Sequence, residues 1–152
     1  MPEDLPPIAD LVPHSGPMCL LSRLLAADTQ HLITEVVVPV SGLFSRPSGV
    51  GAWVGIEYMA QTVAAWAGWQ SRAAGQAPRI GLLLGTRRYC CTVSRFEPGQ
   101  VIHVEIEPSF QADNGLGQFD CRITCAGAEL ARAKLTVFEP ADATAFLQGE
   151  SP

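Results

Sequence analysis

A net charge of −5 over 152 residues gives the chain no general basic surface, so its composition does not predict nucleic-acid binding. The length suits one domain with a sizeable hydrophobic core. Hydrophobic residues make up 47% of the chain and charged residues only 16%. So low a charge density predicts that a second subunit covers part of the surface.

The N-terminal stretch MPEDLPPIAD is acidic and rich in proline, and it lacks the apolar core of a signal peptide. Residues 52–69 are the most apolar segment, but Glu57 interrupts them, which favours a helix buried in protein over a membrane span. The cysteines show no zinc-binding spacing, and Cys121 and Cys125 would lie too far apart on one strand for a disulfide. We therefore expect a cytoplasmic protein with reduced cysteines, no membrane span and no bound metal.

The first half of the chain predicts a hairpin followed by a helix. Residues 19–27 and 31–40 are rich in Leu, Val and Ile and are long enough for two paired strands. A loop rich in Pro, Ser and Gly follows. Residues 52–74 then form the one long helix that the sequence predicts, and Gly75 closes it.

After the helix the chain returns to strands. The first is expected over residues 79–93, and a Pro-Gly turn leads to residues 101–110, where Ile and Val alternate with His and Glu. Residues 114–138 hold two more strands, joined at AGAE. The tail, residues 139–152, has no periodicity and is expected to be loose. These patterns predict a single α+β domain, residues 1–138, with antiparallel strands curled around one helix.

Four segments carry a family resemblance: LVPHSGPMCLLSRL, GLFSRPSGVGAWVGIEYMAQ, LLLGTRRY and FEPGQVIHVEIE. The first resembles the N-terminal opening of the FabZ-type 3-hydroxyacyl-acyl carrier protein dehydratases. The second matches their Gly-His-Phe-Pro…Glu-Ala-Met-Ala-Gln segment with the same spacing, and the last two fit the strand and Pro-Gly turn that follow. The resemblance runs from Leu11 to Phe138. It is closest to the atypical ApeP-like branch of aryl polyene biosynthesis, which shares WVGIEYMAQ and NGLG.

This resemblance implies a hot-dog fold, in which a curved antiparallel sheet wraps a long helix, and a dimer. We expect the dimer to form through sheet edges, because an apolar helix and a low surface charge do not suit a monomer. It also implies substrates that are 3-hydroxyacyl thioesters on the phosphopantetheine of an acyl carrier protein or on coenzyme A, with no further cofactor. The protein would then serve fatty acid or aryl polyene synthesis.

Glu57 and Gln61 form a polar pair in the otherwise apolar helix. Because four residues separate them, they lie on one helix face, and we expect Gln61 to orient a buried carboxylate. The alternative is a buried polar pair that only specifies a dimer core. In the resembling family, the acid at the Glu57 position protonates the departing hydroxyl, and backbone N–H groups at the helix start polarise the thioester carbonyl. The residues at that start are Val50, Gly51, Ala52 and Trp53.

The family's catalytic His lies in the Gly-His-Phe motif before the helix, and here that position is Leu43. The nearby serines are poor bases without help. His14, in the opening motif, is a possible catalytic residue, although a structural hydrogen bond is the simpler interpretation. Three functions stay open: a thioester enzyme (a dehydratase, or a thioesterase using Glu57), a non-catalytic subunit paired with a His-bearing paralogue, and an acyl-binding module.

Acyl carrier proteins are acidic, so a protein that binds them needs a local basic patch. Arg87 and Arg88, in the segment GTRRY, are the predicted docking residues, and the alternative is a pair of solvated strand charges. The lesser candidates are Arg46, Arg79 and Arg95.

Overall fold

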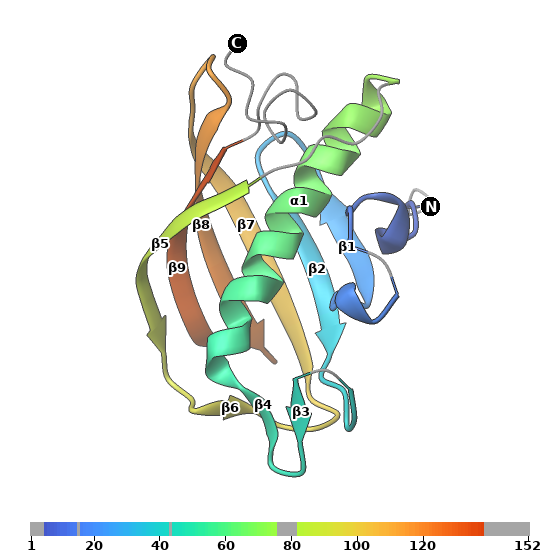
Figure 1. Ribbon diagram of the computed structural model, residues 1–152, viewed down its shortest axis with the longest axis vertical. Coiled ribbons are helices and arrows are strands. Elements are labelled where there is room, and N and C mark those ends of the chain that lie inside the picture. The colour runs from blue at the N-terminus through green and yellow to red at the C-terminus, as the bar shows by residue number, and fades with distance from the viewer. Residues whose placement is uncertain (1–4, 15, 43, 76–81, 139–152) are drawn as a thin grey trace, which may run out of the picture.

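The computed structural model shows one long helix lying across a curved antiparallel sheet (Figure 1). It describes residues 5–14, 16–42, 44–75 and 82–138, without the side chains of residues 82–84. The predictions for Leu43, Arg79 and the tail 139–152 fall outside these residues. Within them, the predicted architecture of one helix wrapped by antiparallel strands is confirmed.

The main sheet has six strands in the order β1-β2-β7-β8-β9-β5, and every neighbouring pair is antiparallel. The strands are β1 (Arg23–Ala27), β2 (Leu32–Val37), β5 (Leu82–Cys91), β7 (Val101–Gln111), β8 (Leu116–Cys125) and β9 (Ala128–Phe138). Strands β1 and β5 form the two edges of this sheet.

Strand β7 shows the alternation that its sequence predicts. Ile102, Val104 and Ile106 are fully buried, whereas His103 and Glu107 are exposed. Successive side chains of a strand point to opposite faces, so one face of β7 packs into the core and the other meets solvent. The buried face contacts the long helix.

The predicted turns are also present. In the β8–β9 hairpin, Ala126 and Gly127 both have positive φ, 50° and 84°, as a two-residue hairpin turn requires. In FEPGQ, the N–H of Gln100 donates to the carbonyl of Glu97 at 3.0 Å, and Gly99 has a φ of 79°. Each turn falls at the motif that predicted it.

Helix α1 spans Gly55–Ala73 and follows a 3-10 turn, η3 (Ala52–Val54). The predicted start at residue 52 is therefore right in position, although the first turn is tighter than an α-helix. Gly75, with a φ of 71°, ends the helix as predicted. The N-terminal segment crosses α1 closely, because a Cβ on Gly68 would lie 2.0 Å from the carbonyl oxygen of Leu11.

The sequence did not predict a second, three-stranded sheet at the end of the molecule where α1 begins (Figure 1). Its strands are β3 (Ser45–Arg46), β4 (Gly49–Gly51) and β6 (Arg95–Phe96), in the order β3-β4-β6. Strands of two or three residues are too short to show periodicity, so the sequence predicts only a loop before the helix. Two 3-10 turns, η1 (Ile8–Asp10) and η2 (Gly16–Met18), precede β1.

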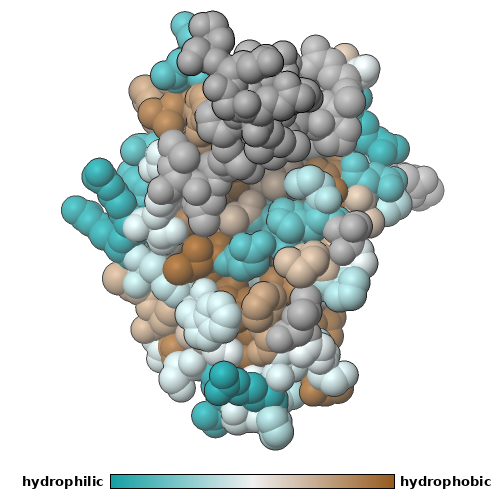
Figure 2. All heavy atoms as spheres, viewed as in Figure 1, coloured by the Kyte–Doolittle hydropathy of each residue, from teal (hydrophilic) through white to brown (hydrophobic). Residues whose placement is uncertain are grey.

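One face of α1 is turned away from the sheet and is only partly covered (Figure 1). Ala60, Ala64 and Ala67 are half-buried there, and Trp53, just before α1, is 65% exposed. The sequence predicts strands curled around this helix and a dimer, and in the single chain this face of α1 is only partly covered. On the described part of this side of the molecule, hydrophobic and hydrophilic residues lie side by side (Figure 2).

Candidate active site

Gln61 is fully buried and ties the segment before β1 to the helix. Its Nε2 donates to the carbonyl of Met18 at 2.8 Å, and its Oε1 accepts the N–H of Leu20 at 2.9 Å. The backbone there is paired with a side chain of α1 and not with a strand. This pairing explains why the strand predicted over residues 19–27 begins only at Arg23.

Glu57 lies one helical turn before Gln61, in the first turn of α1. The Nε2 of Gln61 also donates to Oε1 of Glu57 at 3.0 Å, so the structure places the predicted pair in contact. The side chain of Glu57 is 39% exposed, however, and the expectation that both residues are buried is wrong for Glu57 in this chain. A carboxylate in the first turn faces the positive end of the helix dipole, which favours its position.

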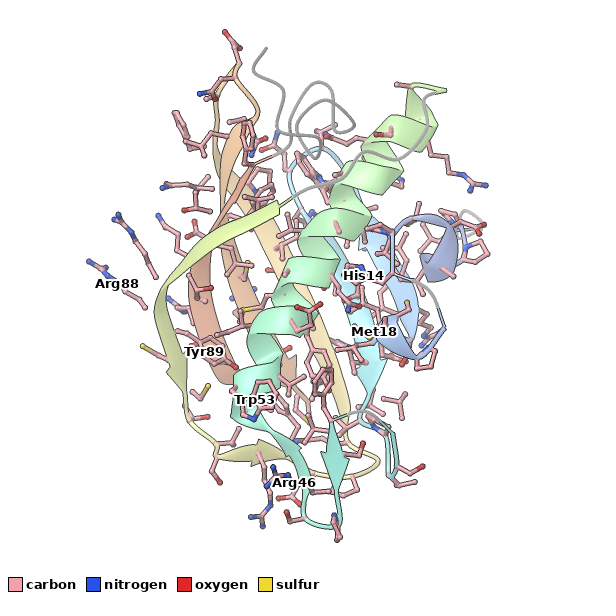
Figure 3. The ribbon with its side chains drawn as sticks, in the orientation of Figure 1. His14, Met18, Arg46, Trp53, Arg88 and Tyr89 are labelled. Atoms are coloured by element: carbon pink, nitrogen blue, oxygen red, sulfur yellow. The ribbon has the colours of Figure 1, made fainter. Side chains whose placement is uncertain are left out.

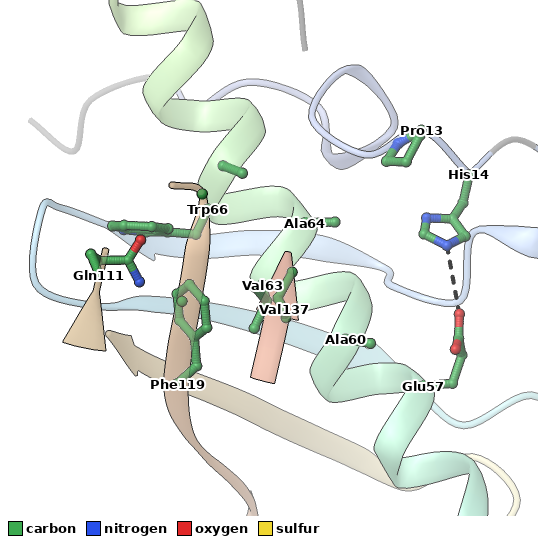
Figure 4. A pocket seen from close by; sticks show the side chains of 13 residues that line it. Pro13, His14, Glu57, Ala60, Val63, Ala64, Trp66, Gln111, Phe119 and Val137 are labelled. Carbon is green, nitrogen blue, oxygen red and sulfur yellow. Dashed lines mark ion pairs between the residues drawn. The ribbon is translucent and has the colours of Figure 1, made fainter. Parts of the chain in front are cut away.

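His14 reaches the same carboxylate from the loop between η1 and η2. Figure 3 shows His14 and Met18 beside the helix, and Figure 4 marks the contact between His14 and Glu57. Nε2 of His14 lies 3.6 Å from Oε1 of Glu57, whereas Nδ1 is buried and has no hydrogen-bond partner among the described residues. The opening motif marked His14 as a candidate, but only the fold shows its partner.

A pocket of about 240 Å³ runs along α1 from this cluster. Glu57, Ala60, Ala64 and Ala67 recur at helical spacing and form one side, and the three small alanines leave the space open. The other sides include Pro13, Val63, Trp66, Gln111, Phe119 and Val137. In Figure 4, His14 and Glu57 lie at one end, with Trp66, Phe119 and Gln111 at the other. Such a pocket can place an acyl chain against the helix with its reactive carbons near a carboxylate.

The four residues of the predicted oxyanion site lie in different surroundings. Val50 and Gly51 belong to strand β4, not to the helix start. The N–H of Ala52 donates to the carbonyl of Ser94 at 3.1 Å, so the prediction for Ala52 is wrong in this chain. The N–H of Trp53 lies in the first turn of η3, where N–H groups have no acceptor inside the helix. An oxyanion role for Trp53 therefore stays a prediction.

Strand β5 contains a bulge at the predicted docking residues. The β5–β9 register shifts between Arg87 and Cys90, and Arg88 has a φ of 55°, which is rare for a residue other than glycine. Tyr89 thereby points toward the start of the helix and donates to the carbonyl of Ala52, while Arg88 points away (Figure 3). Burial raises the pKa of Tyr89 well above its usual range.

Most cationic side chains are paired with carboxylates. Of the ten Arg and Lys residues, Arg79 lies outside the described residues, and six of the other nine form ion pairs. The three without a carboxylate partner in the described part of the chain are Arg46, Arg87 and Arg88. Arg95, a lesser docking candidate, lies 3.5 Å from Glu97.

Across the described residues, no group of His, Cys, Asp or Glu side chains could hold a metal ion. In the same part of the chain, no helix is both long enough and apolar enough to cross a membrane.

Comparisons with known proteins agree with this geometry. The profile of the ApeP-like family, described as ApeP dehydratase, matches residues 6–148. A chain of the dehydratase heterocomplex ApeI:P from Xenorhabdus doucetiae superposes with a TM-score of 0.86 and 29% identity, over 95% of this chain and 97% of that chain. A search of curated proteins gave no match.

More distant structures share the fold alone. A hypothetical thioesterase with coenzyme A from Streptococcus pneumoniae TIGR4 has a TM-score of 0.60 and 14% identity, covering 77% of this chain and 84% of its own. The protein smu.793 from Streptococcus mutans UA159, bound to acetyl CoA, has a TM-score of 0.59 and 12% identity, covering 76% and 86%. Together with the heterocomplex, these structures confirm the predicted hot-dog fold.

Proposed function

Because the chain belongs to the ApeP-like dehydratase family, we propose that it removes water from 3-hydroxyacyl thioesters with Glu57 as the proton donor. The observation that carries this proposal is how the carboxylate is held. Gln61 contacts its Oε1 at 3.0 Å at the polar end of the pocket, and Oε2 has no partner among the described residues. A carboxyl group fixed through one oxygen can deliver a proton from the other at a defined position.

Dehydration takes one proton from the α-carbon and gives one to the leaving hydroxyl. A base removes the α-proton, the carbon–oxygen bond at the 3-position breaks, and Oε2 of Glu57 gives its proton to the departing oxygen, which leaves as water. The product is a 2-enoyl thioester. The proton held by the base then returns to Glu57 before the next turnover. The reaction therefore needs a base in addition to Glu57.

We propose that a second subunit supplies this base. The catalytic His position of the FabZ-type dehydratases that the sequence resembles is Leu43 here, and His14 already contacts Glu57. The helix face beside the pocket is open. Of the residues near it, Met18 is 48% exposed and Trp53 is 65% exposed. The similar ApeI:P protein is itself a heterocomplex. A His-bearing paralogue whose Gly-His-Phe segment reaches this face would complete the acid–base pair, whereas a homodimer would lack that His.

An acyl carrier protein is the proposed source of the substrate, which it would present as a phosphopantetheine thioester during fatty acid or aryl polyene synthesis. Carrier proteins are acidic, so charge complementarity favours unpaired cations as the docking residues. Arg87 and Arg88 are exposed neighbours on β5 without carboxylate partners in the described residues, and the bulge leaves both in solvent. These observations support them over the paired Arg95.

Replacing Arg87 and Arg88 by Glu should abolish carrier-protein binding, because the patch would then repel an acidic partner. Titration calorimetry at low ionic strength is the suitable measurement, since salt screens exposed charges. The matched control is Arg122→Glu with Arg132→Glu, which makes the same charge change at exposed, ion-paired positions on β8 and β9. Unchanged binding by the first variant, or equal loss in both, would remove the patch from the proposal.

The function itself is tested with 3-hydroxybutyryl-pantetheine thioester and mass spectrometry of the products. The chain alone should form the 2-enoyl thioester slowly, and addition of a hot-dog paralogue that carries Gly-His-Phe should restore fast dehydration. Release of free pantetheine and 3-hydroxybutyrate would instead identify a thioesterase. Substrate binding without any product, with or without the paralogue, would identify an acyl-binding module. Either result overturns the dehydratase proposal.

A further inference from the structure

The two ring nitrogens of His14 lie in different surroundings. Nε2 is 3.6 Å from Oε1 of Glu57, the same oxygen that receives the amide proton of Gln61. Nδ1 is buried, and no hydrogen-bond partner for it lies among the described residues. His14 lines the pocket together with Glu57, so its protonation pattern bears directly on the carboxylate.

A neutral imidazole carries one proton, which must lie on one nitrogen or the other. Because no described residue partners Nδ1 of His14 in either case, the environment of Nε2 decides between the two tautomers. A proton on Nε2 attracts the carboxylate oxygen of Glu57, whereas an unprotonated Nε2 would turn its lone pair toward that oxygen and be repelled. The geometry therefore favours the tautomer with the proton on Nε2.

We infer that His14 is a positioning residue that donates its Nε2–H to Oε1 of Glu57. At 3.6 Å this contact is longer than a hydrogen bond, and contacts of this kind tighten when substrate binds. With the donors of Gln61 and His14 both on Oε1, the transferable proton is confined to Oε2. When that proton leaves, the remaining negative charge faces two N–H groups, which stabilises the transition state.

If the proposed dehydratase function holds, this tautomer means that His14 is not the base that takes the α-proton. In the inferred tautomer the nitrogen of His14 beside Glu57 already carries a proton, and the other nitrogen is buried with no partner among the described residues. Neither can accept the α-proton without losing the contact or burying a charge. The base then comes from elsewhere, which agrees with a site completed by a second subunit.

Three substitutions distinguish a donor from a base. Glutamine places an amide N–H near the position of Nε2, whereas asparagine reaches only as far as Nδ1. In the complex with the paralogue, His14→Gln should keep kcat close to that of the wild type. His14→Asn and His14→Ala should lower kcat by about 10–100-fold with KM unchanged, a loss typical of positioning partners. Equal loss in all three variants would identify His14 as a base, and equal retention would leave it without a role, so either result overturns the inference.

Imidazole ¹⁵N NMR measures which tautomer of His14 is present and does not depend on catalysis. It therefore tests this inference independently of the dehydratase proposal. The wild-type chain should show the proton of His14 on Nε2, with the signal assigned by its loss in His14→Gln. Glu57→Ala is the control, because it removes the carboxylate that selects the tautomer and should weaken the preference. A proton on Nδ1 in the wild type would overturn the inference even if the complex dehydrates its substrate.

Discussion

Replacing Leu43 by His should raise dehydration by the isolated chain by ~10²–10⁴-fold, the usual contribution of a positioned general base. Gly42, Leu43 and Phe44 occupy the place of Gly-His-Phe in the FabZ-type dehydratases that the sequence resembles, at the same spacing from Glu57. The acid of the proposed pair is already present and fixed by Gln61. A base introduced at this position would complete the pair within one kind of subunit.

Initial rates of 2-enoyl thioester formation from 3-hydroxybutyryl-pantetheine measure this gain. Leu43→Asn is the matched control, because asparagine is polar but cannot act as a base. The double variant Leu43→His with Glu57→Gln should lose the gain, since the added base still needs a proton donor. A rate for Leu43→His no higher than that of Leu43→Asn would contradict the proposed division of acid and base between two chains.

Contacts within one element could be predicted from spacing alone. Glu57 and Gln61 are four residues apart on a helix, and helix geometry brings such residues together wherever the helix lies. The faces of β7 followed from the same kind of reasoning, because a strand alternates its side chains. In both cases a single local period fixes the geometry.

The contact of His14 with Glu57 could not be predicted in this way. It depends on how the N-terminal segment crosses the helix, where Leu11 approaches Gly68 closely. No local period describes that crossing, and the opening motif indicated only that His14 is a possible catalytic residue. The exposure of Glu57 was missed for a related reason, because composition shows that a helix is apolar but not which side the fold leaves open.

The bulge in β5 could not be predicted from the alternation of side chains that correctly predicts the faces of β7. Regular alternation would place Arg87 and Arg88 on opposite faces of the strand, yet both are exposed and Tyr89 turns toward the helix. The positive φ of Arg88 causes this difference. Arginine gives no sequence signal for such a conformation, in contrast to the glycines at the turns.

Glu57→Gln should lower the rate of dehydration by the complex by ~10²–10⁴-fold without unfolding the chain. Glutamine has the size of glutamate and keeps a carbonyl oxygen that can accept the amide proton of Gln61, so packing and the held position persist. It carries no acidic proton, and the leaving hydroxyl would depart unprotonated. An unchanged melting temperature would show that any loss of rate is chemical.

The most direct measurement is the single-turnover rate of 2-enoyl thioester formation by the complex that carries Glu57→Gln, beside a complex that carries Glu107→Gln. Glu107 is an exposed glutamate on β7, so its variant makes the same chemical change away from the pocket. We predict a loss of ~10²–10⁴-fold for Glu57→Gln, as expected for removal of a general acid, and a wild-type rate for Glu107→Gln. Equal rates in the two complexes would contradict the assignment of Glu57 as the proton donor.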